Sequence, residues 1–260
     1  MFIQNEKYVS KGMAISAIVF IVLSILMLLT GVLIGKNLYF NVVVQDFQQT
    51  GTFSGWNIFE NFDIREFFGT AAILIIGGLF ALISQIFQVI VIYKWSRAIN
   101  TNIDNTRFVF NELKKEVKDK SKNEALDILN FEFSTNKVQD WAYWIYFAML
   151  IIAFFSLGSF AWAAPIGVIF LAIYIHSIFS ISKSLQETKT HIYNFLGKRD
   201  LSNNKYIKDR NVGLFILFII ITFGIYWLYL IIKLSDEIND YLSWDIKTRE
   251  NLLKDLKEKN

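Results

Sequence analysis

The sequence predicts an all-α, multi-pass helical membrane protein with about five hydrophobic segments, whose helices extend into a cytoplasmic helical stalk. Two observations support this fold class. First, residues 141–182 run for 42 residues without a Lys, Arg, Asp or Glu, whereas about 20 uncharged helical residues are enough to cross roughly 30 Å of hydrocarbon. Second, the charged residues, 19% of the chain, gather between such uncharged stretches.

Three further uncharged stretches are long enough to cross a membrane, and they are residues 12–35, 67–93 and 211–232. The first stretch is about twice as long as the apolar core of a secretory signal and no small-residue cleavage site follows it, so we expect it to be retained. We therefore expect the first two transmembrane segments within residues 1–93, joined by an outer loop at 36–66.

The central uncharged run is long enough for two helices, so it predicts a transmembrane helical hairpin over residues 141–182. Gly158 relaxes the backbone, and Pro165 suits the first turn of a helix. We place the outer connection at 159–165, after a helix that ends near Leu157. The alternative is that Pro165, the single proline of the chain, kinks a gating helix.

The distribution of Lys and Arg predicts the orientation, because cytoplasmic loops accumulate these residues. Residues 94–140 hold nine Lys or Arg, and residues 183–210 hold seven against three acidic residues. Residues 36–66 hold two basic and four acidic residues. We therefore expect the N-terminus, a helical segment at 94–140 and a helical extension at 183–210 to be cytoplasmic, and residues 36–66 to be outside.

A short pattern recurs after three of the apolar segments. Each copy has a Ser, an aliphatic residue three positions later and an amide four positions later, and the copies are Ser96 to Asn100, Ser182 to Gln186 and Ser235 to Asn239. Each copy continues into an apolar stripe at helical spacing, and the last one predicts an amphipathic C-terminal helix over 233–260.

The stripes with alternating spacings of four and three are typical of a coiled-coil seam. We expect their side chains to form the interface of the stalk, and these residues are Ile99, Ile103, Phe110, Leu113, Val117, Leu185 and Ile192. The alternative is a set of separate helices lying on the membrane surface. The charged segment 112–122 is read as a solvated helix face, with a basic lipid-binding stripe as its alternative.

The last hydrophobic segment carries a family resemblance. The residues that carry it are Arg210, an apolar run, Thr222, Gly224, Ile225, Tyr226, Trp227 and the run from Lys233 to Asn239. Over about residues 208–240 the chain resembles the prokaryotic membrane family catalogued as domain of unknown function 4234, although Trp227 stands where the family usually has Gly. The family has no assigned activity. The resemblance therefore implies a plasma-membrane protein of a bacterium or archaeon, and it implies no substrate or cofactor.

Residues 211–232 allow two topologies. Their length suits one ordinary span with the C-terminus outside, which is the topology we favour. If all three Ser-bearing copies lie in the cytoplasm instead, the segment must be a re-entrant hairpin that bends at Gly224, and such a bend needs protein cover.

Polar side chains within the apolar segments are few. The intramembrane candidates are Gln85, Gln88 and His176. No Lys, Arg, Asp or Glu lies within the uncharged segments. The two Gln could line a polar path and His176 could relay protons, but hydrogen bonding between helices is the commoner use of such residues. His191 is about 22 Å farther along a continuous helix, too far from His176 to share a metal ion.

Composition narrows the function classes. The absence of Cys excludes disulfides and thiolate sites, a net charge of +3 gives no argument for nucleic acid, and no catalytic or cofactor-binding motif is present. We therefore expect no enzyme, no cofactor and no metal site. The first hypothesis is an assembly, scaffold or accessory subunit in the lipid bilayer, whose cytoplasmic amphipathic helices bind a membrane-protein partner or a second copy in a homo-oligomer. A small channel or transporter is the alternative, followed by an intramembrane enzyme.

Overall fold

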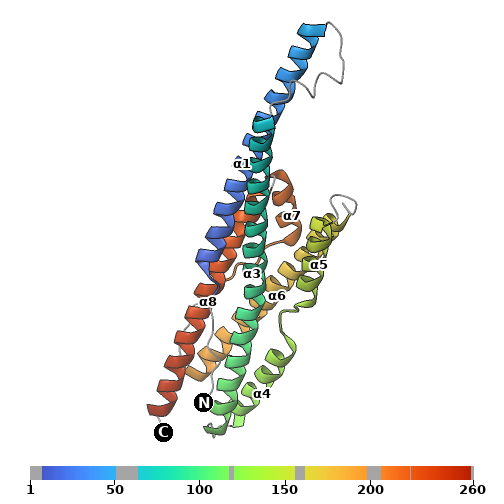
Figure 1. Cartoon of the computed structure of the whole chain (residues 1–260). Helices are drawn as coiled ribbons and strands as arrows, with labels where there is room; N and C mark the ends of the chain where they lie inside the picture. The colour runs from blue at the N-terminus through green and yellow to red at the C-terminus, as the bar shows by residue number, and fades with distance from the viewer. Residues whose placement is uncertain are drawn as a thin grey trace. The chain divides into compact units, whose positions relative to one another are not determined.

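The computed structural model describes residues 8–50, 64–116, 120–155, 162–197, 206–222 and 224–258. These residues form seven helices and no strand (Figure 1). The helices are α1 (Lys11–Thr50), α3 (Ile64–Glu116), α4 (Lys120–Thr135), α5 (Trp141–Phe155), α6 (Ala163–Gly197), α7 (Val212–Ile221) and α8 (Ile225–Glu258). The chain divides into a smaller compact unit, residues 12–88, and a larger one, residues 1–11 with 89–260.

Among the described helices, α1, α3 and α6 are long and apolar enough to cross a membrane, judged by length and composition. The helices α5 and α7 are apolar but have only 15 and 10 residues. The all-α prediction is therefore confirmed for the described residues, and three of the five hydrophobic segments form helices of full crossing length.

In the smaller unit, α1 and the first part of α3 pack through small residues. A Cβ atom added to Gly31 would lie 2.6 Å from the side chain of Leu74, so the two helices approach closely at this level. The hydroxyl of Ser84 donates a hydrogen bond of 2.6 Å to the carbonyl of Ala17. Small residues and Ser hydroxyls are the usual means by which apolar helices associate.

Part of the segment predicted as an outer loop, residues 36–66, is helical. The helix α1 continues to Thr50, and α3 already begins at Ile64. No Gly or Pro interrupts residues 36–50, and Gly51 is the first residue of that kind. The first charged residue after the apolar stretch, Lys36, marks where the stretch ends. A charged residue does not end a helix, so the helix continues past it. Residues 51–63 lie outside the described residues.

In the larger unit, α5 and α6 form an antiparallel pair joined at one end (Figure 1). Pro165 lies in the first turn of α6, which begins at Ala163. The prediction that this proline starts a helix is confirmed, and the alternative of a kink is wrong. The expected connection at 159–165 is too long at its second end, because α6 already begins at Ala163, and residues 159–161 lie outside the described residues.

The charged ends of three helices, together with α4, form what we call the polar bundle: residues 94–116, α4, residues 183–197 and residues 233–258. The ring of Phe110 lies 6.2 Å from that of Phe133 on α4 and 6.1 Å from that of Tyr193 on α6, between centroids. The predicted seam residues are buried here, and they are Ile99, Ile103, Phe110, Leu113, Leu185 and Ile192. These helices thus pack on one another. Val117 lies outside the described residues.

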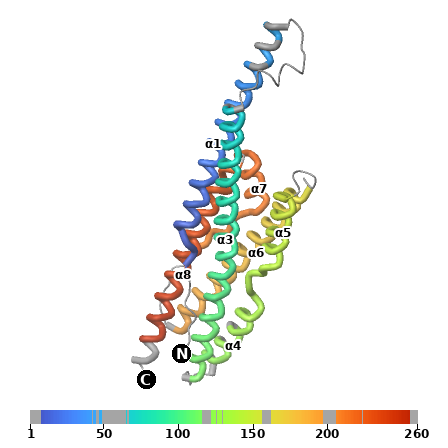
Figure 2. The backbone as a smooth tube through the Cα atoms, viewed as in Figure 1, coloured from blue at the N-terminus to red at the C-terminus, as the bar shows by residue number. Residues whose placement is uncertain are grey.

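The segment 211–232 is two helices and not one. Between α7 and α8 the chain turns at Gly224, whose φ angle of 87° lies in the left-handed region that favours glycine. The two helices contact each other, and Figure 2 lets the reader follow the chain from one into the other. Arg210, before α7, forms an ion pair of 2.6 Å with Glu237 of α8. Because both ends of the segment meet, the favoured single span is wrong and the chain forms a helical hairpin.

Candidate functional site

The amides of the three Ser-bearing copies make an unusual contact. Asn100 donates a hydrogen bond of 3.0 Å from its Nδ2 to the carbonyl of Val138, while the N–H of Val138 donates one of 2.9 Å to Asn100 Oδ1. One side-chain amide thus bonds both the N–H and the carbonyl of a single residue, Val138, which lies between α4 and α5. A carboxamide can do this because it carries an acceptor and a donor side by side.

The same arrangement occurs twice more among the described residues. Gln186 donates to the carbonyl of Ile207 at 3.2 Å and accepts from its N–H at 3.0 Å. Asn239 donates to the carbonyl of Val9 at 2.9 Å and accepts from its N–H at 2.8 Å. We call these contacts amide clamps and the three aliphatic residues the clamped residues. All three clamped residues are buried, so water cannot easily replace the amide.

The clamps follow a cyclic order. Each clamped residue lies shortly before an apolar helix, α1, α5 or α7. Each amide lies within the next helix, α3, α6 or α8. We therefore divide the chain into three modules: residues 9–100, 138–186 and 207–239. The amide of each module binds the clamped residue of the following module, and the third binds the first. The pairs are Asn100 with Val138, Gln186 with Ile207 and Asn239 with Val9.

Charges beside the clamps repeat the same order. The residue after the Ser of the pattern pairs with the residue two positions after the clamped one: Lys183 with Asp209 at 3.3 Å, and Asp236 with Lys11 at 3.1 Å. In the remaining module the equivalent positions hold Arg97 and Asp140, again of opposite charge. The repeat is therefore present in the sequence, in the hydrogen bonds and in the charges.

The Ser residues of the pattern lie inside the larger unit, because Ser96, Ser182 and Ser235 are all fully buried. The indole of Trp95 donates a hydrogen bond of 2.9 Å to Ser235 Oγ, and that hydroxyl donates one of 2.7 Å to the carbonyl of Ile231. A small hydroxyl at this position lets α3 and α8 approach and joins them by a hydrogen bond.

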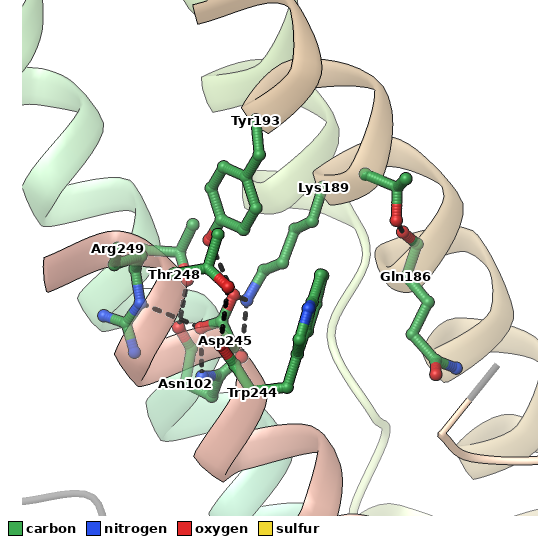
Figure 3. Close-up of polar contacts among 10 residues, drawn as sticks. Asn102, Gln186, Lys189, Tyr193, Trp244, Asp245, Thr248 and Arg249 are labelled. Atoms are coloured by element: carbon green, nitrogen blue, oxygen red, sulfur yellow. Dashed lines mark hydrogen bonds and ion pairs between the residues drawn. The ribbon is translucent and has the colours of Figure 1, made fainter. Parts of the chain in front are cut away.

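Next to the clamps, an ionic network joins three helices of the polar bundle (Figure 3). Lys189 of α6 and Asp245 of α8 both have fully buried side chains, and Lys189 Nζ lies 3.0 Å from Asp245 Oδ1. The hydroxyl of Tyr193 donates to the same carboxylate oxygen at 2.6 Å. Asn102 of α3 accepts from Lys189 at 2.6 Å and donates to Asp245 Oδ2 at 2.7 Å.

Arg249 completes the network, since its Nε lies 2.8 Å from Asp245 Oδ2. Burial by itself raises the pKa of Asp245, but the charges of Lys189 and Arg249 and the hydrogen bonds from Tyr193 and Lys189 together lower it below its usual value. Asp245 is therefore ionised at neutral pH, and its negative charge is shared between two cations. We interpret this network as a device that fixes how the three helices pack, because its members come from α3, α6 and α8 and are bonded to one another across them.

The predicted intramembrane polar residues belong to different units of the chain. In the smaller unit, Gln88 donates a hydrogen bond of 3.1 Å to Ser84 on its own helix, and Gln85 is half-buried. In the larger unit, His176 lies on the exposed face of α6, while Tyr174 and Ile175 beside it are buried. The hydrogen bond of Gln88 is therefore local to α3, and the side chain of His176 faces away from the helices packed against α6.

The motif of the last segment forms the turn between α7 and α8. Thr222 donates from its hydroxyl to the carbonyl of Phe218 at 2.6 Å and accepts from the N–H of Tyr226 at 3.0 Å. One side chain therefore serves the end of one helix and the start of the next. Trp227 packs beside Trp95 with 6.3 Å between ring centroids, whereas Ile225 is exposed.

Sequence reasoning found the Ser-bearing pattern but missed what its amides bind. A usable signal was present, because a Val or Ile follows a Lys or a Lys-Tyr pair before each of three apolar helices, at residues 9, 138 and 207. The ionic network was also missed. Lys189 and Asp245 are 56 positions apart, and charged residues on amphipathic helices normally face solvent.

Comparisons with protein-family models, with curated proteins and with solved structures each find no match to this chain.

Proposed function

We propose that this protein is an assembly or accessory subunit of a prokaryotic plasma membrane, with a cytoplasmic N-terminus and a polar bundle that holds a partner membrane protein. The observation that carries the proposal is a pair of apolar side chains on the outside of the polar bundle. Ile128 and Phe131, one turn apart on α4, are 64% and 71% exposed. The resemblance of residues 208–240 to the family of unknown function supports a prokaryotic membrane protein.

The expected stalk interface cannot serve the partner, because its residues are buried within this chain. Phe110 packs between α4 and α6, and Leu113 is 2% exposed. A partner must therefore use an outer face. Apolar side chains exposed next to each other on an otherwise charged helix mark a protein contact more often than a water-facing surface.

The charges around this pair indicate the chemistry of the partner. Glu124 and Asp127 are exposed on the same helix, near Ile128 and Phe131. Lys114 pairs with Asp127 at 2.6 Å, and Glu124 is a second exposed carboxylate one turn before Ile128. We commit to a partner segment with apolar side chains flanked by Lys or Arg, such as an amphipathic helix after a transmembrane span.

The test compares Phe131→Asp with Ser134→Asp, both on the exposed face of α4. Burial of an aromatic ring contributes about 1.5 to 3 kcal/mol, so we expect Phe131→Asp to lower partner recovery about tenfold or more. Ser134→Asp should leave recovery unchanged. Recovery is measured by purification in mild detergent and mass spectrometry of the chains that co-purify. Recovery of the wild-type protein alone, or equal partner recovery with both variants, would contradict the proposal.

A further inference from the structure

The hairpin of α7 and α8 is too short to cross a bilayer. The helix α7 has 10 residues and therefore a length of about 15 Å, against roughly 30 Å of hydrocarbon. The apolar start of α8, residues 225–232, is shorter still, because Lys233 follows it. A hairpin of these dimensions reaches about half of the hydrocarbon depth.

The base of the hairpin is polar and firmly held. Asn211 caps α7 by accepting from the N–H of Gly213 at 2.8 Å. Arg210 makes two hydrogen bonds to Glu237, of 2.8 and 2.6 Å, and these bonds raise the pKa of its guanidinium although partial burial opposes them. Just before this base, Ile207 is held by the clamp from Gln186. These contacts fix the level at which the hairpin leaves the polar bundle.

The tip has the opposite character. Ile220, Ile221 and Ile225 are 66%, 61% and 69% exposed, so three large aliphatic side chains project from the turn. The described residues of the tip satisfy their backbone donors within the hairpin, as hydrocarbon requires. The N–H groups that donate within the hairpin are those of Thr222, Gly224, Ile225, Tyr226 and Trp227.

We infer that this hairpin is a single-leaflet wedge. Its tip lies among the acyl chains near the bilayer midplane, and its base lies at the surface next to the polar bundle. The occupant of its exposed aliphatic face is lipid, because the length, the polar base and the self-satisfied turn each match half of a bilayer. Such a hairpin displaces acyl chains in one leaflet and leaves the opposite leaflet without a counterpart. The inference does not depend on the proposed partner.

The test measures depth. Because the natural chain has no Cys, Ile221→Cys at the tip and Val212→Cys at the base can each carry one fluorophore. The labelled full-length proteins are placed in vesicles of phosphatidylcholine and phosphatidylglycerol, whose acyl chains carry bromine near either the headgroup or the methyl end. We expect the deep bromines to quench the tip label more than the shallow ones, with the reverse order at the base.

Ile220→Cys is a second tip position, which serves if Ile221→Cys fails to fold, and it should give the same order of quenching. A tip label quenched mainly by shallow bromines, or a tip Cys that reacts with a membrane-impermeant reagent, would overturn the inference. Equal, weak quenching at tip and base would place the hairpin outside the bilayer and would also overturn it.

Discussion

At the scale of single residues, the most consequential feature is a buried carboxylate with two cations. Removing Asp245 and Lys189 from water costs several kcal/mol for each ion, and the cost is offset only because every charge has close partners. Because the pKa of Asp245 is lower in the folded protein than in the unfolded chain, the network contributes stability at neutral pH. That contribution is lost as the pH falls below about 4, the ordinary pKa of an Asp.

We predict that Lys189→Met destabilises the protein by about 3 to 5 kcal/mol, because it removes one of the two cations that neutralise the buried carboxylate of Asp245. The matched control is Lys183→Met, one turn and a half earlier on α6. Lys183 is half-exposed and pairs with an exposed Asp209, so its loss should cost about 0 to 1 kcal/mol. Unfolding is followed in detergent by tryptophan fluorescence. Equal stability of the two variants would show that the buried network does not hold the helices together.

At the scale of elements, the turn at Gly224 decides whether the last apolar segment is a hairpin. A Cβ added there would meet nothing within 4 Å, so a larger residue is resisted by the backbone and not by crowding. Residues other than glycine cost about 1 to 2 kcal/mol in the left-handed region, and Asn tolerates it best. The conformation of one residue therefore sets the topology of 22.

We predict that Gly224→Val lowers stability by at least about 1 to 2 kcal/mol, while Gly224→Asn is tolerated. The matched control is Gly78→Val, since a Cβ at Gly78 also meets nothing within 4 Å but the backbone there is helical. Gly78→Val should be neutral or slightly stabilising. The measurement is thermal unfolding of the purified variants. If Val is accepted as well as Asn at position 224, the turn does not have the backbone conformation described.

Much of the element structure was predictable from the sequence, and the failures have physical reasons. Gaps between charges located all five apolar segments, and helical spacing identified buried seam residues such as Phe110 and Leu113. The hairpin at Gly224 was only the alternative to a single span, because 22 apolar residues satisfy a span and a hairpin equally well. Periodicity also cannot distinguish Gly224, which needs a positive φ, from Gly77 and Gly78, which lie inside a helix.

At the scale of the whole molecule, three modules of one plan are linked by clamps in cyclic order. The modules differ in the length of their first apolar helix: α1 has 40 residues, α5 has 15 and α7 has 10. The modules share the amide clamp, which joins each of them to the next. The sequence showed the repeat as a pattern of Ser and amide, but the binding of one module to the next is a long-range contact, which local spacing does not encode.

The cyclic order gives a prediction for three equivalent variants. Asn100→Ala, Gln186→Ala and Asn239→Ala each leave the two backbone groups of one buried residue without partners. Each variant should lose about 1 to 3 kcal/mol of stability. The matched control is Asn111→Ala on α3, an exposed amide whose partner is the half-buried side chain of Asn130, and it should be close to neutral.

The specific readout is hydrogen exchange at the clamped residues. Each variant should speed exchange at the N–H of its own clamped residue: Val138 for Asn100→Ala, Ile207 for Gln186→Ala and Val9 for Asn239→Ala. The third variant is the most informative, because Asn239 links the C-terminal module to a residue 230 positions earlier in the chain. If exchange at Val9 is unchanged by Asn239→Ala, the modules form an open row and not a closed ring. Unequal losses of stability among the three variants would instead show that the repeated sequence pattern hides clamps of different importance.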